Sequence, residues 1–498
     1  MKQSAFIKIN PADSVVVCLR PMAKGEIIEI DGKKIELLQD TPAGHKVLLD
    51  DASEGTNIIK YGYPIGHARQ DLKAGEWVNE NNLKTNLAGT LEYEYKPVNE
   101  ILNIKNENRT FKGYVRKNGE VGVRNEIWIV PTVGCVNGIA EKLVELLTKE
   151  TQLEGIDAIH AWHHNFGCSQ LSDDHENTRK VLRDICLHPN AGAVLVLSLG
   201  CENNIPEDFM AMLGDYDKDR IRLLVTQRVE GDEIEEGMKV LRELYAIAKQ
   251  DKRQDVPLSE LRVGLKCGGS DGFSGITANP LVGELSDYVV AQGGTSVLTE
   301  VPEMFGAETI LMNRCKTPEL FEQTVSLINN FKNYFLSHGE PVGENPSPGN
   351  KAGGISTLED KALGCTQKCG RAPVSGVMEY GERLQSKGLN LLSAPGNDLV
   401  ASTALAASGC QIVLFTTGRG TPFGTFIPTM KISTNSSLYQ RKPNWIDFNA
   451  GVLTEGIEMK DLVRQFIDKV IAVASGEKTR NEENGYREIS IFKNGVTL

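Results

Sequence analysis

Residues 127–137, with the sequence IWIVPTVGCVN, contain the pattern that decides the fold of this chain. An apolar run of strand length ends in a glycine-rich polar turn, and a helix-like segment follows through Leu147. The same apolar run and polar turn recur in residues 156–168, 193–203, 261–272, 389–398 and 411–420. Strands that alternate with helices in this way favour an α/β architecture with largely parallel sheets.

The polar residues of these repeats gather where each predicted strand ends. In open parallel sheets, ligands bind outside the carboxyl ends of the strands. Loops at such ends supply many binding and catalytic side chains, because a rigid scaffold positions them. We therefore look for chemistry in the loops of this chain rather than on its helices.

The first 92 residues differ from the rest, because short apolar runs are broken there by turn residues. This pattern predicts a small β-rich domain. Residues 93–110 are polar and poorly periodic, which indicates a linker. The segment of residues 249–257 is charged and helix-breaking, and a fresh strand follows it, which indicates a boundary near residue 255. We therefore predict a second α/β domain over residues 111–255 and a C-terminal α/β domain over residues 256–498.

The chain has 498 residues and a formal net charge of −12. This charge argues against nucleic-acid binding, which needs a basic surface. It does not argue against an anionic small molecule, because a local pocket can oppose the global charge. No apolar run approaches the roughly 20 residues that span a bilayer, and MKQSAFIKIN at the start lacks the apolar core of a secretory signal. We expect a cytoplasmic protein without membrane or nucleic-acid partners, and a homodimer is the expected oligomer.

Seven of the ten cysteines stand next to a glycine. In a long intracellular chain such cysteines are expected to be free, buried or metal-binding rather than disulfide-bonded. Close packing of small residues at strand ends explains the pairing with glycine. So does a site where the backbone approaches a ligand closely. The loop CGGSDGFSG, residues 267–275, could wrap an anionic group with its backbone N–H donors.

Four of the eight histidines fall within residues 160–175, together with a cysteine and two aspartates. Such a cluster on and after a strand end can bind a divalent metal or supply a general base. The spacing matches no zinc-finger or zincin motif. We favour His164 or His175 as functional, with His160 in the core and His163 on the surface. His45, in the segment AGHK, stands alone, and a lone histidine is more often structural.

Arg419 lies between two glycines after a predicted strand. Its planar guanidinium fits a carboxylate through two hydrogen bonds, and an ion pair that stabilises the fold is the alternative. Lys351, Lys361 and Lys368 lie in a polar stretch, and one of them could contact a substrate. Their spacing does not rank them.

Residues 44–86 resemble the SAF domain, a small β-clip module. Nine loops resemble the altronate and galactarate dehydratase family: VGCVNG, FGCSQ, DDH, GCENN, CGGSDGFSGITANP, ENPSPGNKAGG, GCTQK, SAPGND and TGRGTP. The resemblance runs from near residue 1 to the terminal FKNGVTL. It implies an N-terminal SAF domain, a second α/β domain and a larger C-terminal domain.

The resemblance also implies an activity, the removal of water from D-altronate to give 2-dehydro-3-deoxy-D-gluconate in the galacturonate branch of hexuronate breakdown. Family members are activated by Fe²⁺, with Mn²⁺ as the alternative. Within the matching motifs, residue chemistry suggests the site. We predict catalytic roles for His164, Asp174 and His175. We predict substrate binding by Ser270, Asp271, Asn397, Asp398 and Arg419, and metal binding by His45, His164, Cys168, His175 and Glu202.

This chemistry suits the residue types. A metal that chelates the carboxylate and the 2-hydroxyl stabilises the enediolate formed when a base removes the C2 proton. A second group or the metal then assists departure of the C3 hydroxyl. Histidine, cysteine and carboxylate ligands together suit Fe²⁺ better than Mg²⁺ or Ca²⁺.

Four alternatives stay open. The substrate could be galactarate or another sugar acid. Sulfite could leave in place of hydroxide, although relatives of that type carry the SAF part on a separate chain. The protein could be a sugar-acid-binding scaffold rather than an enzyme. Finally, an iron–sulfur cluster could serve as the Lewis acid, held by three of Cys135, Cys168, Cys201, Cys267 and Cys365.

Overall fold

The apolar run of residues 127–130 is buried on both sides in the computed structural model, which describes residues 4–98, 100, 102–343 and 345–498. Ile127 and Ile129 pack on one face of the sheet, and Trp128 and Val130 pack on the other. Alternate residues of a strand point to opposite faces, so a strand that is apolar throughout needs cover on both. This strand is β12 (Glu126–Pro131), the second strand of a four-stranded sheet.

The second domain is built on this four-stranded sheet, whose order is β13-β12-β14-β15 and whose pairings are all parallel. Parallel neighbours need crossover connections, and helices supply them here. The remaining strands are β13 (Ala158–Ala161), β14 (Ala191–Ser198) and β15 (Ile221–Val225). The helices are α1 (Asn137–Thr151), α2 (Ser172–Cys186), α3 (Pro206–Met212) and α4 (Glu233–Ala248).

The C-terminal domain contains a parallel sheet of seven strands in the order β19-β20-β18-β17-β21-β22-β23. Its strands are β17 (Arg262–Cys267), β18 (Thr295–Leu298), β19 (Val374–Met378), β20 (Gly388–Leu392), β21 (Ile412–Thr417), β22 (Thr429–Ser433) and β23 (Phe448–Asn449). Its longer helices are α5 (Ala278–Ala291), α7 (Pro318–Ser337), α9 (Leu358–Cys365), α10 (Asp398–Ala407) and α12 (Met459–Ala474). The shorter ones are α6 (Glu308–Met312), α8 (Pro348–Ala352), α11 (Ser436–Arg441) and α13 (Arg480–Asn484).

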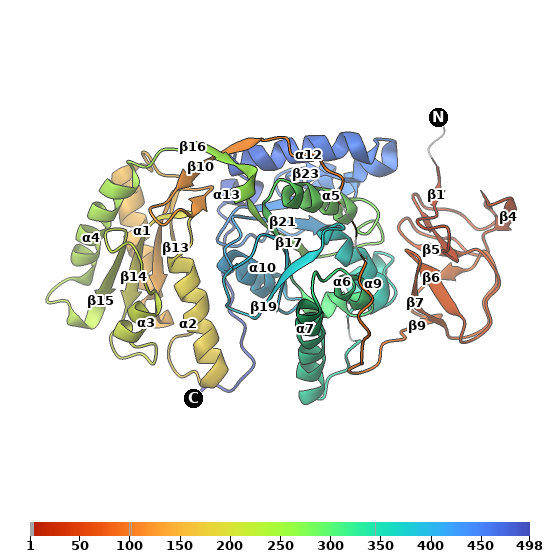
Figure 1. Ribbon diagram of the computed structural model, residues 1–498, viewed down its shortest axis with the longest axis horizontal. Coiled ribbons are helices and arrows are strands. Elements are labelled where there is room, and N and C mark those ends of the chain that lie inside the picture. Colours follow the sequence, from red (N-terminus) through yellow and green to blue (C-terminus); the bar gives the residue numbers. More distant parts are fainter. Residues whose placement is uncertain (1–3, 99, 101, 344) are drawn as a thin grey trace.

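One hydrophobic core joins these two domains. It contains Trp128 of the second sheet and Phe415 of the seven-stranded sheet, together with Leu182 of α2 and Leu405 of α10. The helices α2 and α10 therefore pack between the two sheets, as Figure 1 shows. Because a shared core removes apolar surface of both parts from water, the two domains stabilise each other.

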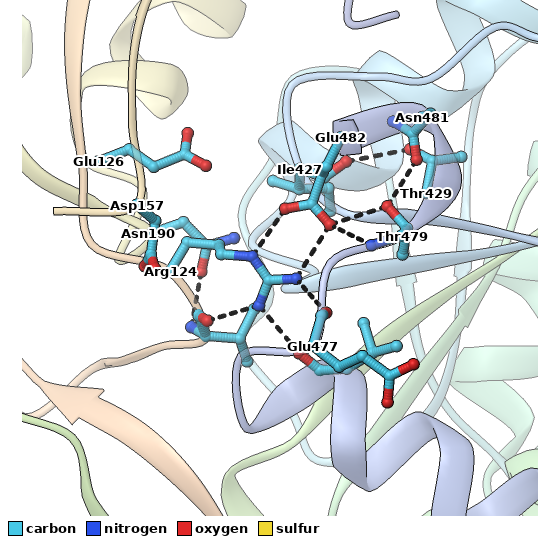
Figure 2. Close-up of polar contacts among 12 residues, drawn as sticks. Arg124, Glu126, Asp157, Asn190, Ile427, Thr429, Glu477, Thr479, Asn481 and Glu482 are labelled. Carbon is cyan, nitrogen blue, oxygen red and sulfur yellow. Dashed lines mark hydrogen bonds and ion pairs between the residues drawn. The ribbon is translucent and has the colours of Figure 1, made fainter. Parts of the chain in front are cut away.

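A buried ion pair also crosses this boundary. Figure 2 shows Arg124, just before β12, and Glu482 of α13, whose closest nitrogen and oxygen atoms are 2.7 Å apart. Thr479 adds a hydroxyl and a backbone N–H to the same carboxylate. Burial alone would raise the pKa of Glu482, but the charge and hydrogen bonds of Arg124 lower it to about 2. The carboxylate is therefore ionised at neutral pH and depends on its partner.

The N-terminal domain is antiparallel, and its short strands explain the frequent turn residues of the first 92 positions. One sheet has the order β1-β2-β5-β8, another β6-β7-β9, and β3 pairs with β4. The strands are β1 (Phe6–Ile7), β2 (Val15–Cys18), β3 (Ile27–Ile30), β4 (Lys33–Glu36), β5 (Lys46–Leu48), β6 (Asn57–Lys60), β7 (Tyr63–Ala68), β8 (Trp77–Val78) and β9 (Leu83–Lys84).

The segment between the N-terminal and second domains crosses the C-terminal domain before it enters β10 (Thr110–Val115) (Figure 1). Leu87, Tyr93, Tyr95 and Ile104 pack against the core of that domain. The strand β10 then pairs antiparallel with β11 (Val121–Gly122) and β16 (Gln254–Pro257). The linker is thus attached along most of its described length.

The predicted fold class is confirmed, since an antiparallel β domain precedes two α/β domains with parallel sheets. Among the described residues, no helix combines the length and apolar character that a membrane crossing requires.

Candidate active site

A pocket of about 720 Å³ in the C-terminal domain lies at the carboxyl ends of its strands. Gly268 and Gly269 follow β17, and Asn397 and Asp398 follow β20. Asn397 caps α10, because its side-chain oxygen accepts the N–H groups of Leu399 and Val400. This cap fixes the start of the helix and with it Asp398 at the pocket.

Two thiols and a carboxylate converge beside this pocket. The Sγ atoms of Cys267 and Cys365 are 3.3 Å apart, and they lie 3.1 and 3.2 Å from the same oxygen, Oε2 of Glu303. All three side chains are buried, and Glu303 also lines the pocket. Among the described residues, this is the one group of three such side chains whose potential ligand atoms lie within 4.8 Å of one another. We call it the Cys–Glu–Cys cluster.

Three buried lysines surround the Cys–Glu–Cys cluster. The Nζ of Lys368 is 2.7 Å from Cys267 Sγ, and the Nζ of Lys361 is 2.7 Å from Glu303. Lys266 bonds to Glu300 and lies 2.8 Å from Asp398. Ammonium groups buried this deeply need anionic partners to offset the loss of water.

The electrostatics of the cluster favour an ionised carboxylate and a protonated thiol in the metal-free protein. Burial would raise the pKa of Glu303, but the nearby charge of Lys361, followed by those of Lys368 and Lys266, lowers it to about 2. The hydrogen bond with Cys267 and burial raise the pKa of the Cys365 thiol well above its ordinary value. A metal bound here would displace thiol protons, so its affinity would rise with pH.

Counting charges tests whether the cluster fits a divalent metal. The three ammonium groups of Lys266, Lys361 and Lys368 are balanced by three carboxylates, those of Glu300, Glu303 and Asp398. Ionising both thiols adds two negative charges, which a divalent cation offsets. Two thiolates and one carboxylate suit Fe²⁺ or Zn²⁺, whereas Mn²⁺ prefers oxygen ligands. The donor set therefore fits Fe²⁺ better than Mn²⁺.

The N-terminal domain closes one side of this region. Lys46 and Lys60 both bond to the buried carboxylate of Asp360 on α9, at 2.8 and 2.9 Å. Thr357 caps the start of the α9 helix, because its hydroxyl accepts the N–H of Asp360. The same helix carries Lys361 and Cys365. The ion pairs of Asp360 thus couple the position of the N-terminal domain to that of the cluster.

The predicted metal ligand His45 lies at this domain contact. Its Nδ1 accepts the indole N–H of Trp77 at 3.1 Å, and its Nε2 lies 3.3 Å from the carbonyl oxygen of Ala352. Ala352 ends α8, whose Lys351 lines the pocket. The structure therefore places His45 behind the pocket wall rather than in the Cys–Glu–Cys cluster.

Other predicted ligands lie in loops at the carboxyl edge of the second sheet, where the described residues form no group of three potential ligand atoms. His164 is buried between backbone groups, with Nε2 2.8 Å from the Pro131 carbonyl oxygen and Nδ1 accepting the N–H of Phe166. Burial lowers the pKa of His164 to about 4. Glu202 accepts the hydroxyl of Thr132 and the N–H of Gly200, while Cys168 is exposed.

Asp174 and His175 lie in the first turn of α2. The Asp174 carboxylate accepts the backbone N–H groups of Asn494 and Gly495, at 2.9 and 2.8 Å. The Nε2 of His175 is buried without a hydrogen-bond partner among the described residues. Neither residue lines the pocket of the C-terminal domain.

Two of the five predicted substrate-binding residues, Asn397 and Asp398, line the pocket. Ser270 is buried and lines a separate cavity of about 10 Å³, and its hydroxyl has no hydrogen-bond partner among the described residues. The Asp271 carboxylate accepts hydrogen bonds from the side chains of Ser274, Thr434 and Asn435, so it holds these loops together. Arg419 is exposed, and its N–H bonds to the carbonyl oxygen of Gly269, a pocket residue.

Sequence reasoning missed Glu303, and it named Cys267 and Cys365 only among five candidate ligands of an iron–sulfur cluster. Glu300 and Glu303 lie two and five residues after the strand TSVL, residues 295–298, so acidic residues shortly after a strand were the available signal. Cys365 belongs to a CxxxC pair, but its partner Cys369 bonds to backbone and to Arg314 instead. The pairing of Cys365 with Cys267, 98 positions away, is a property of the fold.

Comparison with known proteins places the chain. Three family models match it: the altronate/galactarate dehydratase SAF domain over residues 4–86, the D-galactarate dehydratase/altronate hydrolase second domain over residues 113–249, and the C-terminal domain of D-galactarate/altronate dehydratase over residues 258–497. The chain belongs to the altronate/galactarate dehydratase family. The N-terminal antiparallel domain is thus the SAF domain that the sequence predicted. The exact domain bounds predicted above stay a prediction.

Full-length relatives refine this placement within the family. The chain is 58% identical to the altronate dehydratase of Bacillus subtilis over 496 residues, which is 99% of this chain and 100% of the relative. It is 54% identical to the altronate dehydratase of Escherichia coli, over 99% of this chain and 100% of the relative. It is 31% identical to the galactarate dehydratase (L-threo-forming) of E. coli, over 98% of this chain and 96% of the relative.

Proposed function

We propose that this family member removes water from D-altronate to give 2-dehydro-3-deoxy-D-gluconate, within the galacturonate branch of hexuronate breakdown. The observation that carries the proposal is the difference in identity, 54–58% to two altronate dehydratases against 31% to a galactarate dehydratase, all over nearly the full length. Galactarate is the second candidate substrate, because it differs from a hexonate mainly at the end remote from C2.

The pocket supports a small polar substrate. Its volume of about 720 Å³ lies within the range of sites that hold small molecules, roughly 300–1,000 Å³. Lys361 presents a buried cation to it, and the ion pair with Glu303 outweighs burial and raises the pKa of that ammonium group. A cation that stays charged at neutral pH is suited to the substrate carboxylate.

We further propose that Cys267, Glu303 and Cys365 hold the metal, with Fe²⁺ as the native ion and Mn²⁺ as a weaker substitute. The charge balance and the two sulfur ligands support this assignment. Bound here, the metal would act as a Lewis acid toward the substrate carboxylate and 2-hydroxyl. Lys361 would keep the Glu303 carboxylate ionised and in place.

For the chain's own part in the reaction, we propose Asp398 as the base that accepts the C2 proton. Asp398 lines the pocket, its side chain is 35% exposed, and Lys266 holds one of its oxygens at 2.8 Å. No histidine is found among the described residues that line this pocket. Lys361, which bonds to Glu303 and Asn345, would orient the carboxylate of the substrate. The catalytic roles predicted for His164, Asp174 and His175 stay a prediction.

The proposal is tested on the full-length protein made metal-free and then loaded with Fe²⁺, Mn²⁺ or Zn²⁺. The substrates are D-altronate, further hexonates and galactarate, and the 2-keto acid product is measured. We expect turnover of D-altronate with Fe²⁺, less with Mn²⁺, and slower turnover of galactarate. Failure of every metal to restore altronate turnover would refute the proposal. A higher kcat/KM for galactarate than for D-altronate would identify galactarate as the substrate.

The iron–sulfur alternative makes a different demand on the fold, since three cysteines must meet around one cluster. Cys267 and Cys365 meet, whereas Cys135, Cys168 and Cys201 are exposed and follow strands of the second sheet. Visible absorption of the anaerobically purified enzyme distinguishes a single metal ion from an iron–sulfur cluster. A colourless active enzyme supports a single metal ion, and a brown one supports a cluster.

The cytoplasmic location and the homodimer belong to this proposal as well. All ten cysteines are free thiols, which suits a reducing compartment. Cell fractionation and sedimentation of the purified protein test these two statements separately from the activity.

A further inference from the structure

The end of the chain passes the pocket on its way from the C-terminal domain to the second domain. We call residues 488–498 the C-terminal tail. Its aromatic residue, Phe492, lines the pocket, and the chain ends beside α2 of the second domain (Figure 1). One short segment therefore contacts both the pocket and the first turn of α2, which carries Asp174.

The tail is attached to the C-terminal domain before and at Phe492. The N–H of Ser490 bonds to the hydroxyl of Thr403 on α10, at 3.0 Å. Ile491 is buried, and the N–H of Phe492 bonds to the hydroxyl of Tyr380 at 2.9 Å. The Phe492 ring packs edge-on against Tyr334, another pocket residue, with ring centroids 5.6 Å apart.

Beyond Phe492, the tail is attached to the second domain, and Asp174 makes the central contact. Its carboxylate is only 2% exposed and accepts the N–H groups of Asn494 and Gly495, one on each oxygen. A Cβ atom on Gly495 would lie 2.8 Å from Asp174 Oδ2, so glycine permits the close approach. Thr497 pairs with Gln170, and the N–H of Leu498 bonds to Ser169. A buried carboxylate with two charge-assisted bonds fixes the tail firmly.

The residues that line the pocket differ in chemistry. Lys361, Glu303 and Asp398 are charged and adjoin the Cys–Glu–Cys cluster or its lysines. Phe331, Phe335 and Phe492 are apolar. A hexonate whose C1 carboxylate pairs with Lys361 can place its far end against these aromatic rings. A hydroxymethyl group is tolerated against an apolar ring, whereas a second carboxylate would lose water there.

We propose that the C-terminal tail forms the wall of the substrate pocket that selects a hexonate over a hexarate. In this proposal Phe492 is the specificity-determining residue, and Asp174 is a positioning residue that holds Phe492 through the backbone of Asn494 and Gly495. The inference rests on the proposed function, because it assigns a role within the same pocket. It gives Asp174 a role outside the chemical step, in contrast to the catalytic role predicted from its motif.

The test compares kcat/KM for D-altronate with kcat/KM for galactarate, using the Fe²⁺-loaded full-length enzyme. In Phe492→Ala we expect the altronate preference to fall by about tenfold, the lower end of what one apolar group contributes to discrimination. The expected loss for altronate is mainly a higher KM. Phe492→Leu keeps an apolar wall and should retain most of the preference, which shows whether the chemistry of the wall, rather than misfolding, is responsible.

Asp174→Asn keeps the size of the side chain but replaces one acceptor oxygen by an amide N–H₂ group. We expect it to lower the altronate preference in the same direction as Phe492→Ala and to expose Lys493 to trypsin in the native protein. The matched control is Asp173→Asn, because Asp173 is the exposed neighbour on α2. The control should match the wild type in both the preference and the trypsin cleavage rate.

The outcomes separate this inference from the proposed function. A wild-type enzyme that dehydrates no hexonate refutes the proposed function. An active wild type whose preference is unchanged in Phe492→Ala refutes the inference alone, and would point to Lys351 as the partner of a second carboxylate. Loss of turnover in Asp174→Asn while the tail stays resistant to trypsin would also refute it, because Asp174 would then act in the chemical step.

Discussion

The two parallel sheets of this protein carry similar loops at their carboxyl ends but present them to different surroundings. In the second domain the pairs Gly134-Cys135, Gly167-Cys168 and Gly200-Cys201 place their thiols in solvent. In the C-terminal domain Cys267 and Cys365 also adjoin glycines, but both are buried beside Glu303 and three lysines. The same short motif therefore does not determine the chemistry, and the difference lies in what covers the sheet edge.

The cover of the C-terminal edge comes from distant parts of the chain. The SAF domain contributes Lys46 and Lys60, and the C-terminal tail contributes Phe492. Once water is excluded, charges interact more strongly, so the buried Lys361 can hold the Glu303 carboxylate ionised. At the second sheet the polar groups of His164 and Glu202 are instead satisfied locally, by backbone and by Thr132. The edge of the C-terminal sheet is thus covered by distant parts of the chain, whereas His164 and Glu202 at the edge of the second-domain sheet form hydrogen bonds with nearby groups.

The largest effect is expected from the Cys–Glu–Cys cluster. Cys267→Ser and Glu303→Gln should each lower kcat for D-altronate by about a thousandfold, the equivalent of roughly 4 kcal/mol in barrier height. Metal content, measured on the purified protein, should fall in parallel. The control is Cys201→Ser at the edge of the second sheet, which should keep both activity and metal. If Cys201→Ser lost its metal and Cys267→Ser kept it, the metal would be assigned to the edge of the second sheet instead of the Cys–Glu–Cys cluster.

The next effect concerns the ion pair that joins the two sheet domains. Glu482→Gln leaves the buried charge of Arg124 uncompensated, so we expect a loss of about 3 kcal/mol in the free energy of unfolding. Glu483→Gln on the same helix is the control, because its pair with Arg480 is about half exposed on both sides and should contribute under about 1 kcal/mol. Urea unfolding followed by the fluorescence of the tryptophans compares the variants.

The pH dependence of that difference follows from the lowered pKa of Glu482, about 2 in the folded protein, against roughly 4.3 in the unfolded chain. Because the pKa of Glu482 is lower in the folded than in the unfolded protein, its contribution to the free energy of unfolding is fully present above pH 4.3. This contribution is lost as the pH falls toward 2. The stability difference between wild type and Glu482→Gln should therefore shrink between pH 4.3 and 2. A difference that stays constant over this range would assign it to packing rather than charge.

A smaller effect is expected at His164. If its ring serves only the two backbone bonds, His164→Gln should lower the free energy of unfolding by about 1–3 kcal/mol and leave the metal content unchanged. Loss of metal with little loss of stability would instead support the ligand role predicted from the sequence. Metal analysis and urea unfolding of the same preparation give both answers.

The smallest effect concerns thiol exposure. In the native protein three thiols, those of Cys135, Cys168 and Cys201, should react quickly with a chromogenic disulfide reagent, because they are exposed. The other seven should react only after unfolding, since burial keeps the reagent out. Replacing Cys168 by Ala should remove one fast thiol and change stability by under about 0.5 kcal/mol. Fast reaction of Cys267 or Cys365 would show that the C-terminal edge is open.

The periodic pattern of residues 127–137 and its repeats determined the α/β class, and the turn-rich start of the chain determined the β domain. These features depend on local spacing, which is why they can be read without coordinates. The sequence also placed the polar loops at strand ends, and it marked Asn397 and Asp398, both of which line the pocket.

Only the tertiary structure decided which loops share a site. Glu303 and Cys365 come from separate connections, and each meets Cys267 across intervals of 36 and 98 residues. It likewise showed that the Asp174 carboxylate is occupied by the end of the chain, 320 residues away. Spacing along the sequence carries no information about such contacts, because strand order and domain packing, rather than chain distance, bring the side chains together.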